Sequence, residues 1–484
     1  MTGSAAVAFL CLSAHAGRPT DGAGLYAFDD ADDVDWVDGP SGLVRVHYSR
    51  SGPNETRLSD DDGDGAPDFP AMVASTAEDV VLFFGEYGFR PPLRESDLGL
   101  PPLGGSDAFD VYLVDFAGGA DGQFAVDACS GAVCSGHMVM ENDFVGYGYP
   151  SLAEAVDVLT SHELFHAVQS AYNADQPVWM SEGTAVWAEW LYQPGVRDFL
   201  YFSNAYLEDT GRSIDRPPAG VATAFSYGTA LFFAFLDEHV GPWAAVALQE
   251  EMDGRDADQA LEAVAAVVEA GGMALPDAWS TFAEWNLAVG ARAGEATSYS
   301  FADQLGEPTL EKSFEDRLVE DDNRFYPLAA TYYQLTHGGG ELGFATVDDA
   351  TDVRFSLFPV RDGEADGVVG EPRVRWRPDG PGRVSLGNLP AGGYLLVGTY
   401  PHPASQSRRV AFCVGPIDAL ESCLPDDQPE RGAVEGGSTG SEDERSAGCS
   451  TAGGDHPAVL LLLPGLFSLM RRRRLATRES LQAY

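Results

Sequence analysis

The sequence predicts an α+β domain, with a strand-rich first lobe and a helical second lobe, followed by an all-β sandwich. Alternating apolar runs prevail before about residue 150, and helical periodicity prevails from there to about residue 290. Short β-like runs then recur from about residue 326. A chain of 484 residues is long enough for more than one domain. We place the first domain at residues 25–310 and the second at residues 326–416.

The first lobe is predicted to combine three strands with one helix. The alternating run Leu-Val-Arg-Val-His-Tyr predicts a strand at residues 43–48, and the pattern at about 70–87 predicts a helix. Two more strands are expected at 109–116 and 136–141. Loops rich in Gly and Pro separate these elements.

A well-capped helix is predicted between the first lobe and the helical second lobe. Ser151 and Glu154 form an S-x-x-E capping box, and Val158, Phe165 and Val168 form an apolar stripe along the same helix. We therefore expect one side of this helix to pack into the core and the other to face a cleft. Further helices are predicted at 180–192, 226–240, 243–252, 257–270 and 276–289.

The second domain is predicted from seven short runs separated by Gly, Pro and Asp turns. Strands at this spacing are typical of a β-sandwich. The runs lie at 328–336, 342–347, 353–360, 373–377, 383–387, 393–400 and 408–414.

The capped helix carries the sequence His162-Glu163-Leu164-Phe165-His166. Two histidines four residues apart lie on one helical face, so both can bind one Zn²⁺, with Glu163 beside them as a general base. A catalytic zinc usually takes a third protein ligand and a water, and Glu182 on the next helix can supply that ligand. The alternative is that the histidines are surface polar residues that bind no metal.

Three other residues are candidates for the same site. Glu189 lies seven residues after Glu182, so it can hydrogen-bond a zinc ligand or remain a solvated carboxylate. Catalysis of acyl transfer also needs a donor to the oxyanion. Tyr227 and His239 are candidates for that donor, and a packed aromatic is an equally good interpretation of Tyr227.

An acidic loop at residues 60–68 predicts a second metal site. Asp60, Asp62, Asp64 and Asp68 surround a tight turn at Gly65, and clustered carboxylate oxygens suit Ca²⁺. The twelfth position of an EF-hand loop has no carboxylate here, so we expect an abbreviated, structural calcium loop. The alternative is a solvated acidic loop without a metal.

Charge and cysteine spacing indicate export. The formal net charge of −46 excludes nucleic acid and anionic lipid as partners of the folded part. Residues 1–16 have an apolar run and a small-x-small site, which predicts a signal peptide; a disordered N-terminus is the alternative. Two local disulfides are expected from the close spacing of Cys129 with Cys134 and of Cys413 with Cys423.

The C-terminal part is predicted to be a linker and an attachment segment. Residues 425–455 are rich in Gly, Ser, Glu and Asp, which indicates disorder. The apolar run Pro457–Met470 is shorter than the roughly 20 residues of a full membrane span, and Arg471–Arg474 supply a stop-transfer charge. We expect residues 448–484 to act as a sorting or membrane segment; a buried helix is the alternative.

The stretch His162–Glu189 resembles the gluzincin peptidases. Its second half matches their E-G-x-A-x-aromatic-x-E motif, with Trp187 as the aromatic, although the fifteen residues between the motifs are fewer than in the aminopeptidase branch. Residues 40–300 also resemble a family of secreted metalloproteases of myxobacteria. The shared features are the acidic loop, Gly88–Pro92, Phe109–Leu113 and the H-E-x-x-H helix.

These resemblances imply a zincin-like fold, a zinc held by His162, His166 and Glu182, and Glu163 as base. The tail around Cys449 resembles myxobacterial C-terminal sorting tails, in which the cysteine marks the processing region. We therefore expect an exported, surface-attached zinc metallopeptidase with a protein or peptide substrate, a structural calcium and a membrane contact through its tail. The alternative is a non-catalytic surface adhesin or binding protein on a zincin scaffold.

Overall fold

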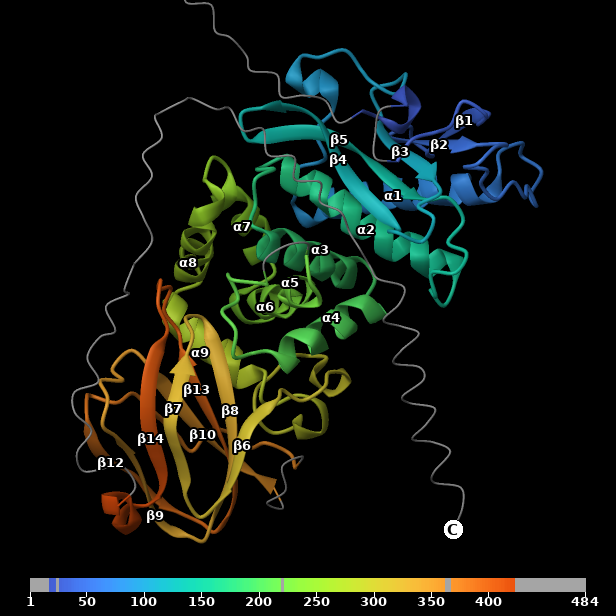
Figure 1. The fold of residues 1–484 in the computed structure, drawn as a ribbon. Coiled ribbons are helices and arrows are strands. Elements are labelled where there is room, and N and C mark those ends of the chain that lie inside the picture. Colours follow the sequence, from blue (N-terminus) through green and yellow to red (C-terminus); the bar gives the residue numbers. More distant parts are fainter. Residues whose placement is uncertain (1–16, 23–25, 219–221, 362–366, 423–484) are drawn as a thin grey trace, which may run out of the picture.

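The computed structural model describes residues 17–22, 26–218, 222–361 and 367–422 (Figure 1). The chain is a mixed α+β protein with three β-sheets, which confirms the predicted α+β class. The predicted signal peptide, the partner cysteine Cys423, the linker and the C-terminal segment lie outside the described residues.

The first lobe is built on a five-stranded sheet in the order β1-β2-β3-β5-β4. Strands β2, β3 and β5 run parallel, and the edge strands β1 and β4 pair antiparallel with their neighbours. Two helices, α1 and α2, pack on one face of this sheet (Figure 1). The elements are β1 (Val34–Asp38), β2 (Val44–Ser49), β3 (Phe109–Val114), β5 (Val133–Glu141), β4 (Gly122–Ser130), α1 (Asp68–Tyr87), α2 (Leu152–Ser170) and the 3₁₀ turn η2 (Glu95–Leu98).

Strand β4 is absent from the sequence prediction, and it is the edge strand beside α2. It forms a hairpin with β5 through the two-residue turn Gly131-Ala132, in which Gly131 has φ of +69°. Cys129 and Cys134 face each other across this hairpin and form a disulfide, as the spacing predicts. Cys413 is also disulfide-bonded.

The second lobe consists of helices that follow α2 (Figure 1). The helix predicted at 226–240 is present as the helical segment Ala224–Val240, which is interrupted at Thr229, whose hydroxyl donates to backbone carbonyls within α5 and on α3. Helix α4 is rich in aromatic residues and was not predicted. The helices are α3 (Val178–Tyr192), α4 (Arg197–Glu208), α5 (Ala224–Gly228), α6 (Ala230–Phe235), η3 (Leu236–Val240), α7 (Ala244–Met252), α8 (Ala260–Ala270) and α9 (Leu275–Trp285).

In the part of the chain that the structure describes, no single helix is long and apolar enough to cross a membrane. One pair, Ala224–Val240 with Ala244–Met252, passes the length and composition test together but is bent by 118°.

The C-terminal part contains two sheets, in the orders β11-β10-β13-β8-β6 and β12-β9-β14-β7. Their facing side chains, including Phe344, Phe355 and Phe412, form one apolar core. Two strands precede the predicted start of this domain at residue 326. The strands are β6 (Leu310–Glu315), β7 (Leu318–Phe325), β8 (Ala329–His337), β9 (Gly340–Thr346), β10 (Arg354–Val360), β11 (Val374–Trp376), β12 (Gly382–Leu389), β13 (Gly392–Tyr400) and β14 (Arg408–Pro416).

Helix α9 joins the two parts of the protein. Trp279 Nε1 donates to Thr399 Oγ1 at 3.1 Å, and Tyr332 Oη donates to the carbonyl of Ala283 at 2.9 Å. An apolar cluster surrounds these bonds, with residues from α9, β8, β10 and β13. Because these contacts are buried, the β-domain is docked on the helical lobe.

Candidate metal centre

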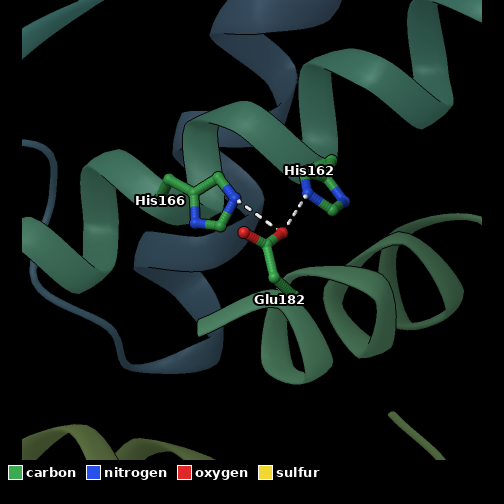
Figure 2. Close-up of side chains that lie close together, drawn as sticks. All are labelled: His162, His166 and Glu182. Atoms are coloured by element: carbon green, nitrogen blue, oxygen red, sulfur yellow. Dashed lines mark ion pairs between the residues drawn. The ribbon is translucent and has the colours of Figure 1, made fainter. Parts of the chain in front are cut away.

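Helices α2 and α3 lie side by side and bring three predicted ligands together (Figure 2). His162 and His166 come from α2, and Glu182 comes from the first turns of α3. Glu182 Oε2 lies 3.4 Å from His162 Nε2 and 3.5 Å from His166 Nε2. One ligand atom from each residue lies within 4.8 Å of the other two, so all three can reach one ion.

These atoms lack the hydrogen bonds that buried polar groups normally make. Nε2 of both histidines and Oε2 of Glu182 have no hydrogen-bond partner among the described residues. A separation of 3.4–3.5 Å is too long for a good N–H···O bond. Two ligands of a tetrahedral ion with bonds of about 2.05 Å lie about 3.3 Å apart, which is close to the observed separation. The three residues therefore fit a zinc ion.

The remaining ring nitrogens are held by side chains that fix the orientation of both histidines. His162 Nδ1 lies 2.6 Å from Glu189 Oε1, and His166 Nδ1 lies 2.8 Å from Gln169 Oε1. With the proton on Nδ1, each Nε2 keeps its lone pair for a metal. The predicted contact between Glu189 and a ligand is present.

Gln169 also belongs to the candidate site, although the sequence motifs do not point to it. Its amide nitrogen donates to the carbonyl of Ser181 and to Thr184 Oγ1, both at 2.8 Å. Gln169 therefore joins α2 to α3 next to both the second histidine and Glu182. Its position three residues after His166, on the same helical face, was the available signal.

The electrostatics of the cluster favour a positive charge at its centre. Burial alone would raise the pKa of Glu182, but His166 and His162 lower it to about 2. Burial alone would lower the pKa of His162, but Glu182 and Glu189 raise it well above its ordinary value. In the absence of a metal, protons supply the charge that an ion would otherwise bring.

Glu163 lies beside the ligands and is 1% exposed. Burial raises the pKa of its carboxyl, and the two histidines offset part of that rise. The backbone amide of Phe124, on strand β4, lies close to this carboxylate and favours its charged form, while Oε1 has no hydrogen-bond partner among the described atoms. The edge strand therefore lies beside Glu163, and Oε1 is available to accept a proton.

The two candidate oxyanion donors have different positions. The ring of Tyr227 lies 6.1 Å from that of His162 and packs against Phe202 at 4.8 Å. Burial, followed by the charges of Glu182 and Glu163, raises the pKa of Tyr227, so the phenol stays protonated. His239 instead packs its ring in the aromatic contacts between η3 and α9, so the structure does not bring it to the ligands.

A cavity of about 10 Å³, large enough for one water, is lined in part by His162. Glu189, Asp198 and Tyr227 are among its lining residues. Next to it, Tyr149 Oη donates to the buried carboxylate of Asp121 at 2.7 Å. Burial raises the pKa of Asp121 and of Asp198 to about 6. No sequence pattern indicates this group, because its members come from separate loops and helices.

The face of the metal helix that carries the two histidines is largely buried. His162, Glu182 and His166 are 3%, 5% and 7% exposed, and α2 is buried on both sides along most of its length. Helix α3 and strand β4 both contact α2.

The acidic loop gathers three of its four predicted ligands. One carboxylate oxygen from each of Asp60, Asp62 and Asp64 lies within 4.8 Å of the other two, and all three residues are exposed. Asp60 Oδ1 also accepts the N–H of Gly63 at 2.8 Å, which folds the loop around them. Asp68 lies at the start of α1, and its carboxylate instead accepts the N–H of Asp61.

The chain matches no known family profile and no curated protein. Among solved structures, it has a match to PliG of Aeromonas hydrophila, a periplasmic lysozyme inhibitor of g-type lysozyme. The match has 19% sequence identity and a TM-score of 0.15, and covers 21% of this chain and 92% of that one. A likeness this weak carries no argument about the fold or the function.

Proposed function

We propose that the protein is an exported, surface-attached zinc metallopeptidase with a zincin-like catalytic domain and a following β-sandwich. One observation supports this most strongly. Two histidine nitrogens and one glutamate oxygen converge without hydrogen-bond partners at the separation that a tetrahedral zinc requires. Glu163 lies next to them with one oxygen free, which is the position of a general base.

The residues of the site have distinct roles in this proposal. His162, His166 and Glu182 would hold the zinc, which when bound acidifies a water and polarises a carbonyl. Glu163 accepts the proton of the attacking water and passes it to the leaving amine, so the peptide bond breaks with no net change in protons on the enzyme. The protonated phenol of Tyr227 is the donor offered to the oxyanion.

The same proposal includes attachment and a structural calcium. Export and retention at the cell surface rest on the sequence of residues 1–16 and 448–484, with the membrane reached through the C-terminal segment. Calcium in the acidic loop is supported by the three gathered carboxylates of Asp60, Asp62 and Asp64. An exposed acidic loop of this kind suits a hard cation.

The variant Glu163→Gln tests the catalytic role directly. It removes the base but no ligand, so zinc content should match wild type while cleavage of a peptide library falls by roughly 10²-fold or more. Glu154→Gln, in the first turn of the same helix, is the matched control and should retain full activity.

Equal turnover by Glu163→Gln and wild type would refute this mechanism. A wild-type protein that binds zinc stoichiometrically but cleaves nothing in the library would favour the alternative of a non-catalytic binding protein.

A further inference from the structure

The outer face of the first sheet, on the side opposite α1 and α2, carries a buried cluster of charges. Asp110 on β3, Asp127 on β4 and Glu95 on η2 are each at most 3% exposed. His47 Nε2 lies 2.8 Å from Asp110 Oδ1, and His137 Nδ1 lies 3.0 Å from Asp127 Oδ1. Three carboxylates buried together cost free energy unless a cation pairs with them.

Arg18 supplies that cation. Its Nε and one Nη form a fork on Asp127, at 3.2 and 2.6 Å, and the same Nη donates to Glu95 at 3.0 Å. The other Nη donates to Tyr112 Oη at 3.2 Å and to Asp110. All five N–H donors of the guanidinium are therefore used. Burial alone would lower the pKa of Arg18, but the charges of Asp127 and its neighbours raise it, so the side chain stays charged.

The chain around Arg18 also fits this face of the sheet. The backbone N–H of Arg18 donates to Asp21 within a short 3₁₀ turn. Tyr26 packs on Phe116 with ring centroids 3.9 Å apart, and Phe28 joins the same apolar cluster. A buried guanidinium followed by two aromatic anchors is a specific docking arrangement.

Asp127 has a special place in strand β4. Val126 pairs with Gly136 and Ala128 pairs with Ser135, so Asp127 is the extra residue of a β-bulge. Arg18 holds the side chain of this extra residue with two hydrogen bonds. Three residues earlier in the same strand, the backbone amide of Phe124 lies close to Glu163, on the helix α2 that β4 contacts. Arg18 thus fixes the strand that positions the proposed base.

We propose that Glu95, Asp110 and Asp127 form a guanidinium-binding site, and that its occupation by the chain's own Arg18 locks strand β4 next to Glu163. Arg18 is a positioning residue in this proposal. The binding site stands independently of the enzymatic activity, whereas the effect on Glu163 rests on the proposed function.

The first test is chemical rescue of Arg18→Ala. Removing one partner of a buried charge network should lower the melting temperature by about 6 °C or more. Millimolar ethylguanidinium should restore most of that loss, and ethylammonium, which lacks the fork, should not. Arg50→Ala is the matched control, because Arg50 pairs with Asp35 on the same lobe with both side chains well exposed. Its melting temperature should change little and should not respond to ethylguanidinium.

Two results of this test would overturn the binding site. One is an Arg18→Ala protein whose melting temperature equals those of Arg50→Ala and wild type. The other is a destabilised Arg18→Ala protein that responds equally to ethylguanidinium and ethylammonium. If Arg18→Ala does not fold, Arg18→Lys replaces it, since lysine keeps the charge but not the fork. Amide hydrogen exchange across residues 122–130 should then be faster than in wild type, and unchanged exchange would refute the lock.

The second test addresses the link to Glu163. At a temperature where Arg18→Ala is folded, its kcat should fall while its zinc content stays at the wild-type value, and ethylguanidinium should restore kcat. Rescue of stability without any change in kcat would refute the link and leave the binding site intact. If wild type has no peptidase activity, the proposed function fails, and melting and exchange still decide the guanidinium site.

Discussion

Separate replacement of Glu182 and Glu189 tests the geometry of the proposed metal site most sharply. Both residues lie on α3, seven positions apart, and both contact the same imidazole. Glu182 Oε2 lies 3.4 Å from His162 Nε2, whereas Glu189 Oε1 lies 2.6 Å from His162 Nδ1. Because a ring can direct only one nitrogen at a given ion, Glu182 is on the metal side and Glu189 is on the far side.

The two positions predict effects of different size. Glu189→Ala removes a hydrogen bond that orients a ligand, and a loss of that kind typically costs 10–100-fold in metal affinity, or about 1.4–2.7 kcal/mol. Glu182→Ala removes a ligand and leaves two histidines without the negative charge that completes the site. We expect its zinc affinity to fall by more than 100-fold, beyond the range for Glu189→Ala.

The assay is metal content after dialysis, followed by competition with a chelator of known zinc affinity. Glu182→Ala should lose zinc and activity together, while Glu189→Ala should retain zinc when the metal is in excess. Glu154→Ala, in the first turn of α2, controls for the loss of a carboxylate elsewhere in the lobe. The reverse ranking, with zinc lost only from Glu189→Ala, would refute the assignment of the third ligand.

Three further predictions concern other parts of the chain. Calcium at a hundredfold excess over Kd should raise the free energy of unfolding by about 2.7 kcal/mol. A melting temperature that does not change with calcium, or that changes equally in wild type and Asp60→Asn, would contradict the calcium loop. Burial raises the pKa of Asp121 in the folded protein to about 6, whereas its pKa in the unfolded chain is about 3.9. The free energy of unfolding therefore decreases as the pH rises from the unfolded pKa to the folded pKa. Asp121→Asn should remove the part of this pH dependence that Asp121 contributes, while Asp198, whose pKa is also raised to about 6, keeps its own part. The zinc-free variant should be more stable than wild type at pH 7 by up to about 3 kcal/mol, and urea titrations with identical pH profiles would count against this. Truncation before Cys449 should release the protein into the medium, and equal cell retention would show that the tail is not the anchor.

The two histidines of the candidate metal site could be predicted from the sequence because their spacing is local. The separation of His162 and His166 by four residues places them on one helical face in any α-helix. The cap of that helix is equally local, and the Ser151 side chain does accept the N–H of Glu154 at 3.1 Å. Glu182 required one more step, because its position depends on how α3 packs against α2.

The closed surroundings of the site could not be predicted in the same way. Strand β4 reads Gly-Gln-Phe-Ala-Val-Asp-Ala-Cys-Ser, with small and polar residues that give little apolar alternation. Its bulge at Asp127 breaks the remaining alternation, since one extra residue inverts the faces that follow. The spacing of Cys129 and Cys134 around Gly131 was a usable hairpin signal. Because this strand was not predicted, the sequence did not indicate how deeply the candidate ligands are buried.

The interruption at Thr229 shows how a tertiary contact modifies a helix that periodicity predicts. The run from 226 to 240 is apolar enough for one helix, yet the hydroxyl of Thr229 donates to the carbonyl of Ser226 at 2.7 Å and also reaches the carbonyl of Trp179 on α3. Gly183, also on α3, allows this approach, because a Cβ there would lie 2.1 Å from Thr229 Oγ1. The break separates α5 from α6 at the point where Tyr227 meets His162. A contact between two helices thus sets the position of the proposed oxyanion donor, and no pattern within either helix contains that information.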